Sequence, residues 1–130
     1  MDSRLKVIIV DDDNAMAQMC AKLIQRRGHS AIIAGSCRDA IAIVREARDI
    51  DVVITDFQMP HMTGLQLLAR LHAIDETLPI ILMTGHAEVF STDRAIALGA
   101  ADYIAKPFDS DTFVHSIERA SRSRHNLAHN

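Results

Sequence analysis

The sequence has 130 residues, 48% of them hydrophobic and 24% charged, with a formal net charge of −3 at pH 7. This size and composition predict one globular domain with a single core, and they exclude two domains of ordinary size. The slightly acidic balance argues against direct binding to nucleic acid or to an anionic membrane surface, and no apolar stretch is long enough to cross a membrane.

The cysteines and the N-terminus indicate the compartment. Cys20 and Cys37 fall in amphipathic, helix-like stretches, so we expect buried free thiols rather than a disulfide. Residues 1–4 lead directly into an apolar run without a signal-peptide pattern. We therefore expect a cytoplasmic protein.

Short apolar runs rich in β-branched residues alternate with segments of helical periodicity along the chain. The runs expected to form strands are Leu5–Val10, Ala31–Ala34, Val52–Thr55, Ile80–Met83 and Tyr103–Ala105. Five strands that alternate with five helices predict an α/β domain whose parallel sheet carries helices on both faces.

Capping residues mark the ends of the first three helices. Gly28 stands where the first helix should end, and Ser36 with Asp39 stands where the second should begin. Thr63 with Gln66 matches a capping box at the start of the third helix.

The fourth helix is expected from near Ala87 to Leu98, ending at Gly99, and the fifth from Asp109 or Ser110. Spacings of three and four residues indicate which helical side chains face the core. These are Met16, Met19, Cys20, Leu23 and Ile24 in the first helix, Ala40, Ile41, Val44 and Ala47 in the second, Leu67, Leu68, Leu71 and Ile74 in the third, and Phe113, Ile117 and Ala120 in the fifth.

The polar segment Ser121–Asn130 is expected to be unanchored. The predicted domain therefore covers residues 1–122, and residues 123–130 form a flexible tail or the start of a linker.

Polar side chains follow four of the expected strands. Asp11 and Asp12 follow the first, Asp56 the third, Thr84 the fourth and Lys106 the fifth. Parallel α/β sheets bind ligands outside the carboxyl ends of their strands, so these side chains should meet at one edge. Clustered carboxylates repel one another unless a cation lies among them, and such hard oxygen ligands suit Mg²⁺.

This set of groups predicts phosphoryl transfer to a carboxylate. With a metal held by Asp12 and Asp56, Asp56 can attack a phosphoryl group instead of repelling it. Lys106 supplies a positive charge for the phosphoryl oxygens and Thr84 a hydroxyl donor. The product would be an aspartyl phosphate.

At these residues the chain resembles the receiver domain of two-component response regulators, a CheY-like superfamily. The matching segments are Val10–Asp13, Thr55–Gly64, Leu82–His86 and Gly99–Phe108. The resemblance covers nearly the whole chain in the order and spacing of the family, and it implies a flavodoxin-like (βα)5 sandwich with strand order 2-1-3-4-5.

The resemblance also implies roles for single residues. Asp56 would take a phosphoryl group from the phosphohistidine of a sensor histidine kinase or a phosphotransfer protein. Asp12 would bind Mg²⁺ directly, Asp11 largely through water, and the backbone carbonyl of Gln58 would complete the site. The Lys106-Pro107 peptide would be cis.

In the same family Thr84 and Lys106 would contact the phosphoryl oxygens, and Tyr103 would be the switch aromatic. Gln58 and His86 lie where the family tunes autodephosphorylation. The switch would alter the face formed by the fourth helix, fifth strand and fifth helix, where a downstream target or a second receiver could bind.

Two other classes of protein use related chemistry or the same sheet, and the sequence argues against both. A haloacid-dehalogenase-type phosphatase would need a second acid two residues after its nucleophile, where this chain has Gln58. A flavodoxin-type electron carrier would need an anion-binding loop after the first strand, and Asp11-Asp12-Asp13 has the opposite charge.

We therefore expect a signalling module that catalyses only its own phosphorylation and dephosphorylation. Two alternatives stay open for its output: the domain acts alone by contact, or it belongs to a longer regulator or hybrid kinase whose output lies elsewhere.

Overall fold

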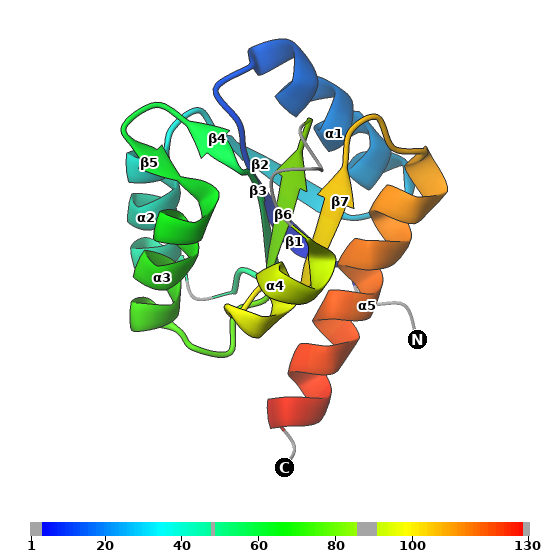
Figure 1. Ribbon diagram of the computed structural model, residues 1–130. Coiled ribbons are helices and arrows are strands. Elements are labelled where there is room, and N and C mark those ends of the chain that lie inside the picture. The colour runs from blue at the N-terminus through cyan, green and yellow to red at the C-terminus, as the bar shows by residue number, and fades with distance from the viewer. Residues whose placement is uncertain (1–3, 48, 86–90, 129–130) are drawn as a thin grey trace.

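A five-stranded parallel sheet lies between two helical layers in the computed structural model, which describes residues 4–47, 49–85 and 91–128 (Figure 1). Its strands are β1 (Lys6–Val10), β2 (Ser30–Ala34), β3 (Val52–Asp56), β6 (Ile80–Thr84) and β7 (Asp102–Ala105), in the order β2-β1-β3-β6-β7. Counted within this sheet, the order is 2-1-3-4-5, which confirms the flavodoxin-like prediction. Each expected strand is present with one of its ends shifted by a single residue.

The helices are α1 (Asn14–Arg26), α2 (Cys37–Glu46), α3 (Gly64–Ile74), α4 (Thr92–Ala97) and α5 (Ser110–Ala128). The expected start of the fourth helix near Ala87 lies outside the described residues. A small antiparallel ladder, β4 (Gln58–Met59) with β5 (Met62–Thr63), follows β3 and was not predicted.

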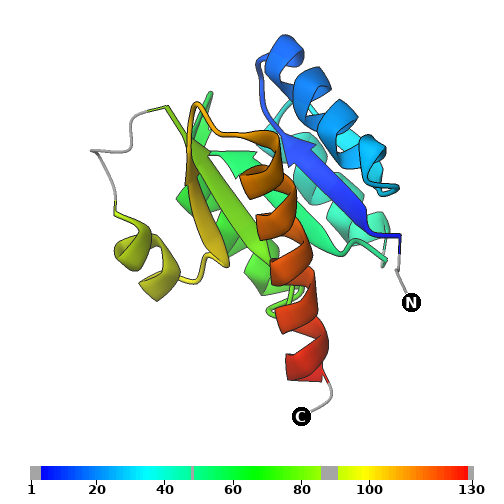
Figure 2. The same cartoon turned by 90° about the vertical axis from the view of Figure 1, so that its right-hand side faces the viewer.

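The three central strands β1, β3 and β6 bury both of their faces, because alternate side chains enter two separate cores. Ile8 and Val10 of β1 belong to the core under α2, α3 and α4, whereas Val7 and Ile9 belong to the core under α1 and α5. Figures 1 and 2 show these helical layers on opposite sides of the sheet. Cys37 lies in the first core and Cys20 in the second, and both are buried free thiols, as expected.

The helix boundaries follow the capping signals in the sequence. The side chains of Asp13, Ser36 and Thr63 accept hydrogen bonds from backbone amides at the starts of α1, α2 and α3, and Thr63 forms the expected capping box. Gly28 and Gly99 have φ values of +87° and +111° just after α1 and α4. Few residues other than glycine adopt these angles, so glycine ends both helices.

Two expected core positions are wrong. Met19 is 43% exposed and Ile74 is 38% exposed. On α1 the small residues Ala17 and Ala21 face the core together with Cys20. Because this stripe of α1 faces the core, Met19 is directed towards solvent.

The expectation of an unanchored segment from Ser121 is also wrong as far as Arg124. The α5 helix continues through this region, Ser121 is buried, and the Arg124 side chain binds Ile50 and Asp75. A polar composition concealed this anchoring because it is made by hydrogen bonds rather than by apolar packing.

None of the described helices combines the length and the apolar character that a membrane span requires.

Candidate functional site

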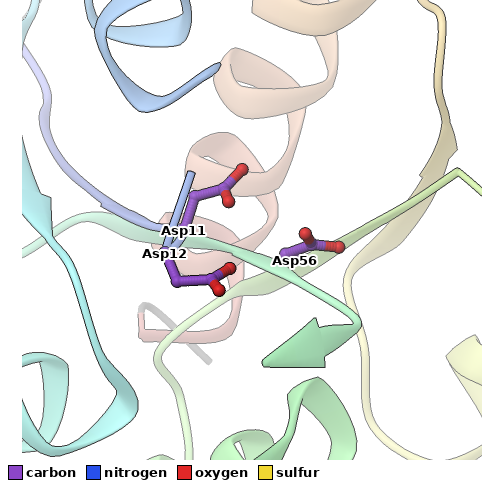
Figure 3. Close-up of side chains that lie close together, drawn as sticks. All are labelled: Asp11, Asp12 and Asp56. Carbon is purple, nitrogen blue, oxygen red and sulfur yellow. The ribbon is translucent and has the colours of Figure 1, made fainter. Parts of the chain in front are cut away.

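Three carboxylates meet at the carboxyl edge of the sheet. Asp11 and Asp12 lie in the loop after β1, and Asp56 is the last residue of the neighbouring strand β3, where Val10 pairs with Thr55. One oxygen from each carboxylate lies within 4.8 Å of the other two. Figure 3 shows the Asp11 and Asp12 side chains directed towards the side where Asp56 lies.

Asp11 is the buried member of this acid cluster, with a residue exposure of 1%. Its Oδ1 accepts a hydrogen bond of 2.9 Å from the Asp13 amide, whereas its Oδ2 has no hydrogen-bond donor among the described residues. Burial raises the pKa of Asp11, and the charges of Asp56 and Asp12 add to this, against the opposing effects of the Asp13 amide and Lys106. The site therefore holds an anionic group that needs a further positive partner.

Lys106 is the cation nearest to this cluster among the described side chains. Its Nζ lies 3.3 Å from Asp56 Oδ2 and 3.6 Å from Asp11 Oδ2. The Lys106 amide donates to the Thr84 carbonyl at 2.7 Å, which ties the end of β7 to the end of β6. The Lys106-Pro107 peptide is cis, as the resemblance implied.

The backbone beneath Asp56 is closely packed. The Thr55 hydroxyl donates to the Asp56 carbonyl at 3.0 Å, and the amide of Gly64 donates to the Phe57 carbonyl at 2.7 Å. A Cβ on Gly64 would lie 2.8 Å from the Asp56 carbonyl oxygen and 3.1 Å from Leu82 Cδ2. Only glycine therefore lets α3 begin directly against the end of β3.

Sequence reasoning missed the supporting roles of Gly64 and Asp13. Asp13 both caps α1 and orients Asp11 through its amide. The sequence held a signal for each residue: Asp13 directly precedes a helix, and Gly64 directly follows a capping threonine. The contact of Asp13 with Asp11 is local, between residues two apart, whereas the close approach of Gly64 to the Asp56 carbonyl arises when α3 packs against the end of β3.

Thr84 and Tyr103 lie on the same face of the sheet. Thr84 ends β6 and is buried, and it follows the alternation of Ile80 and Leu82, which belong to the core under α2, α3 and α4. Tyr103 pairs in register with Leu82, is 9% exposed and belongs to that core as well. Thr84 and Tyr103 therefore share one face of the sheet, with Leu82 beside Tyr103 and Thr84 two residues further along β6.

The remaining two expected site residues are Gln58 and His86. Gln58 is exposed in β4, two residues beyond Asp56, and His86 lies outside the described residues. Within the described ranges, no histidine joins a group with metal-ligand geometry, and Asp11, Asp12 and Asp56 are the cluster that meets this criterion.

The acid cluster fits a divalent cation with hard oxygen ligands. It offers three carboxylates at one point, one of them with a buried oxygen that lacks a hydrogen bond. Mg²⁺ binds through one or two carboxylates and retains several waters, so such a half-open carboxylate site suits it.

Comparison with known proteins places these features in a family. The chain matches the family model for the response regulator receiver domain over residues 7–118. It is 36% identical to the C4-dicarboxylate transport transcriptional regulatory protein DctD of Rhizobium meliloti, over 95% of this chain and 27% of that protein. Identity to the transcriptional regulatory protein FixJ of the same organism is 34%, over 88% of this chain and 56% of that protein.

Solved structures agree with the sequence matches. A response regulator receiver domain protein from Clostridium thermocellum superposes with a TM-score of 0.88 at 28% identity, over 95% of this chain and 98% of that one. The structure described as FixJ-N superposes with a TM-score of 0.83 at 32% identity, over 93% and 96% of the two chains. The chain spans between about a quarter and just over half of the length of these curated relatives.

Proposed function

This chain belongs to the family of response regulator receiver domains, the phosphoacceptor modules of two-component systems, and we propose that Asp56 is its phosphoacceptor. The observation that carries the proposal is the arrangement around Asp56. Its carboxylate ends a buried strand, contacts the Lys106 ammonium at 3.3 Å and lies within 4.8 Å of Asp11 and Asp12.

Receiver domains in general use Mg²⁺, and in this chain we propose that Asp11, Asp12, Asp56 and the Gln58 backbone carbonyl hold the ion. The Asp11 oxygen without a hydrogen-bond donor and the raised pKa of that carboxyl support this ligand set. When bound, the ion supplies positive charge against the oxygens of the incoming phosphoryl group.

In the proposed transfer, a carboxylate oxygen of Asp56 forms a bond to phosphorus while the bond from phosphorus to the histidine nitrogen of the donor breaks. The departing imidazole nitrogen takes a proton from solvent. Lys106, already beside Asp56, places its charge near the equatorial oxygens, and it also offsets the repulsion from Asp11.

The phosphoryl group is proposed to act on the rest of the domain through Thr84 and Tyr103. New negative charge at Asp56 would draw the Thr84 hydroxyl towards it, and Tyr103 would fill the space that this leaves. Their position on one face of the sheet, with Tyr103 in the core under α4, supports the coupling. The affected face is α4, β7 and α5.

Gln58 and His86 are proposed to set the rate at which water removes the phosphoryl group. Gln58 is exposed beside the acid cluster, where it can orient or exclude that water.

Receiver domains of response regulators interact with histidine kinases, so the proposed donor is a sensor histidine kinase or a phosphotransfer protein. The output is either a target or second receiver bound at the α4–β7–α5 face, or a further domain of a longer regulator. The second alternative is supported by relatives such as DctD, of which this chain covers 27%. We propose a cytoplasmic location, which two buried thiols in opposite cores suit.

The assignment is tested with Mg²⁺ and acetyl phosphate, followed by intact mass. Wild type should gain one phosphoryl group, and Asp56→Asn should gain none. Asp13→Asn is the matched control, because asparagine caps α1 as well as aspartate does. Equal labelling of wild type and Asp56→Asn would refute the proposal.

A further inference from the structure

The C-terminal half of α5 is fastened to the edge of the sheet opposite the acid cluster. Among the side chains of α5 that the structure describes, which reach Arg124, the last apolar one in the core is Ala120, and Ser121 is buried beside it. Arg124 lies one helical turn later, and its side chain is only 22% exposed. Figures 1 and 2 show the helix extending beyond the other elements at this end.

The Arg124 guanidinium makes two hydrogen bonds to different parts of the fold. Its Nη1 donates to the Ile50 carbonyl at 2.6 Å, just before β3, and its Nη2 donates to Asp75 Oδ2 at 2.7 Å, just after α3. The other Asp75 oxygen accepts from both the amide and the hydroxyl of Thr77. We name these contacts of Arg124 with Ile50 and Asp75 the Arg124 clamp.

The Arg124 clamp differs from an ordinary surface ion pair. The Arg119 side chain, which binds Asp102, is 60% exposed, and the Asp49 partner of Lys6 is 67% exposed. One acceptor of Arg124 is a main-chain carbonyl, which cannot rotate away, and the planar guanidinium matches both acceptors at once. Burial alone would raise the pKa of Asp75, but the Thr77 hydrogen bonds and the Arg124 charge hold it below the usual value.

The two ends of α5 therefore have different attachments. Its N-terminal end, at Ser110, follows Lys106 after three residues and so is joined closely to the acid cluster. Its C-terminal part is held at the start of β3, whose far end carries Asp56, roughly 20 Å away along the strand. A helix behaves as a stiff rod over the roughly 20 Å between Ser110 and Arg124.

We propose that the Arg124 clamp is a fixed pivot for α5, so that phosphorylation at Asp56 moves the N-terminal half of the helix while residues 121–124 stay in place. The pivot rests on the proposed function of Asp56; the anchoring itself does not. A helix held at one end tilts rather than slides, which gives the displacement at the α4–β7–α5 face a defined direction.

The anchoring is tested by amide hydrogen exchange of residues 121–128 in the free protein. Arg124→Ala should lower the protection of these amides by about tenfold, because a charge-assisted anchor is lost from a helix end. The matched control is Arg122→Ala, since Arg122 is exposed on the same helix and makes no ion pair or side-chain hydrogen bond within the described residues. Asp75→Asn should give an intermediate loss and serves if Arg124→Ala does not fold. Exchange that matches the control in both variants would overturn the proposal.

The pivot is tested with beryllofluoride, a phosphoryl mimic, and amide chemical shifts. In wild type the shift changes should be large from 110 to 117 and should fade by 121–124, whereas in Arg124→Ala they should extend through 121–128. Changes in wild type that are as large at 121–124 as at 110–117 would refute the pivot while leaving the role of Asp56 intact. Failure of wild type to bind the mimic would instead count against the proposed function, and the exchange experiment would still decide the clamp.

Discussion

At the scale of single residues, the carboxylates of Asp11, Asp12 and Asp56 repel one another, and a bound cation can relieve that repulsion. Asp11 is held in place by the Asp13 amide on one oxygen, while its other oxygen is buried without a donor and faces Lys106 at 3.6 Å. Its pKa is raised in the folded state, chiefly by burial. The folded protein therefore loses stability as the pH rises above 3.8, the ordinary value, through the raised folded pKa, and it should recover stability when Mg²⁺ binds.

Asp11→Asn should accordingly stabilise the metal-free protein at neutral pH, by about 1 kcal/mol or roughly 3 °C in Tm. It should also abolish most of the stabilisation by millimolar Mg²⁺. Thermal melts by circular dichroism measure both effects, and they do not need tryptophan, which the chain lacks. Asp12→Asn, at an exposed position, should show a smaller gain without metal. A lower Tm for metal-free Asp11→Asn would contradict this reading of the site.

A second prediction at this scale concerns the lack of space for a side chain at Gly64. An added Cβ would meet the Asp56 carbonyl at 2.8 Å and the Phe57 Cα at 3.1 Å, and backbone atoms cannot move away at low cost. Gly64→Ala should destabilise the fold by about 1–3 kcal/mol and displace Asp56. Gly35→Ala is the control, because nothing lies within 4 Å of its added Cβ. Equal urea midpoints for the two variants would show that the close approach of Gly64 to the backbone of Asp56 and Phe57 does not constrain the residue at position 64.

At the scale of elements, pattern and capping predicted most of the fold. Five strands were found because a parallel sheet buried on both faces demands continuous apolar runs, and the starts of α2 and α3 followed from the caps Ser36 and Thr63. The β4–β5 ladder was missed because two-residue strands are too short to show periodicity.

The orientation of helices was harder to predict than their positions. On α1, a stripe through Met19 and one through Ala17 fit the spacing equally well, and hydrophobicity favoured methionine. How closely the helix approaches the sheet decides between them, and that is a property of the whole fold. Arg124 was missed for the same reason, because its acceptors lie 49 and 74 residues away in the sequence.

The start of α5 gives a prediction on pH. The Thr112 amide and hydroxyl both donate to Asp109, and these hydrogen bonds lower the pKa of that carboxyl. The ionised group therefore stabilises the fold fully above its ordinary value of 3.8, and this contribution disappears as the pH falls through the lower folded pKa.

Asp109→Asn keeps a capping side chain but removes the titration. The difference in Tm between wild type and Asp109→Asn should be constant above pH 5 and should shrink below pH 4, with Asp111→Asn as the control at an exposed position in the first turn of α5. A difference in Tm that grows as the pH falls would show that the ionised form of Asp109 does not stabilise the fold.

At the scale of the molecule, the acid cluster lies at one edge of the sheet, and Thr84 shares a face of the sheet with Tyr103, which packs in the core under α2, α3 and α4. The positions of the acids and Lys106 could be predicted because the carboxyl ends of parallel strands meet at one edge. The face on which Thr84 and Tyr103 lie could be read only from the register of β6 with β7.

This coupling predicts that Thr84→Ala binds beryllofluoride but loses the distant response. In wild type, amide shifts should change at Thr84, Tyr103 and the first half of α5, because the hydroxyl is drawn towards the mimic. Thr84→Ser keeps the hydroxyl and should respond as wild type does. Distant shifts that survive in Thr84→Ala would exclude a route through this hydroxyl.

The assignment of Asp56 as the residue that carries the phosphoryl group can be tested directly. Sodium borohydride reduces an aspartyl phosphate to homoserine, so treatment of the acetyl phosphate-labelled protein followed by peptide mass spectrometry locates the modified residue. We predict homoserine at position 56 alone, formed only when Mg²⁺ is present during labelling. Homoserine at position 11, position 12 or another acid, or its absence from a protein that carries phosphate, would contradict the assignment of Asp56.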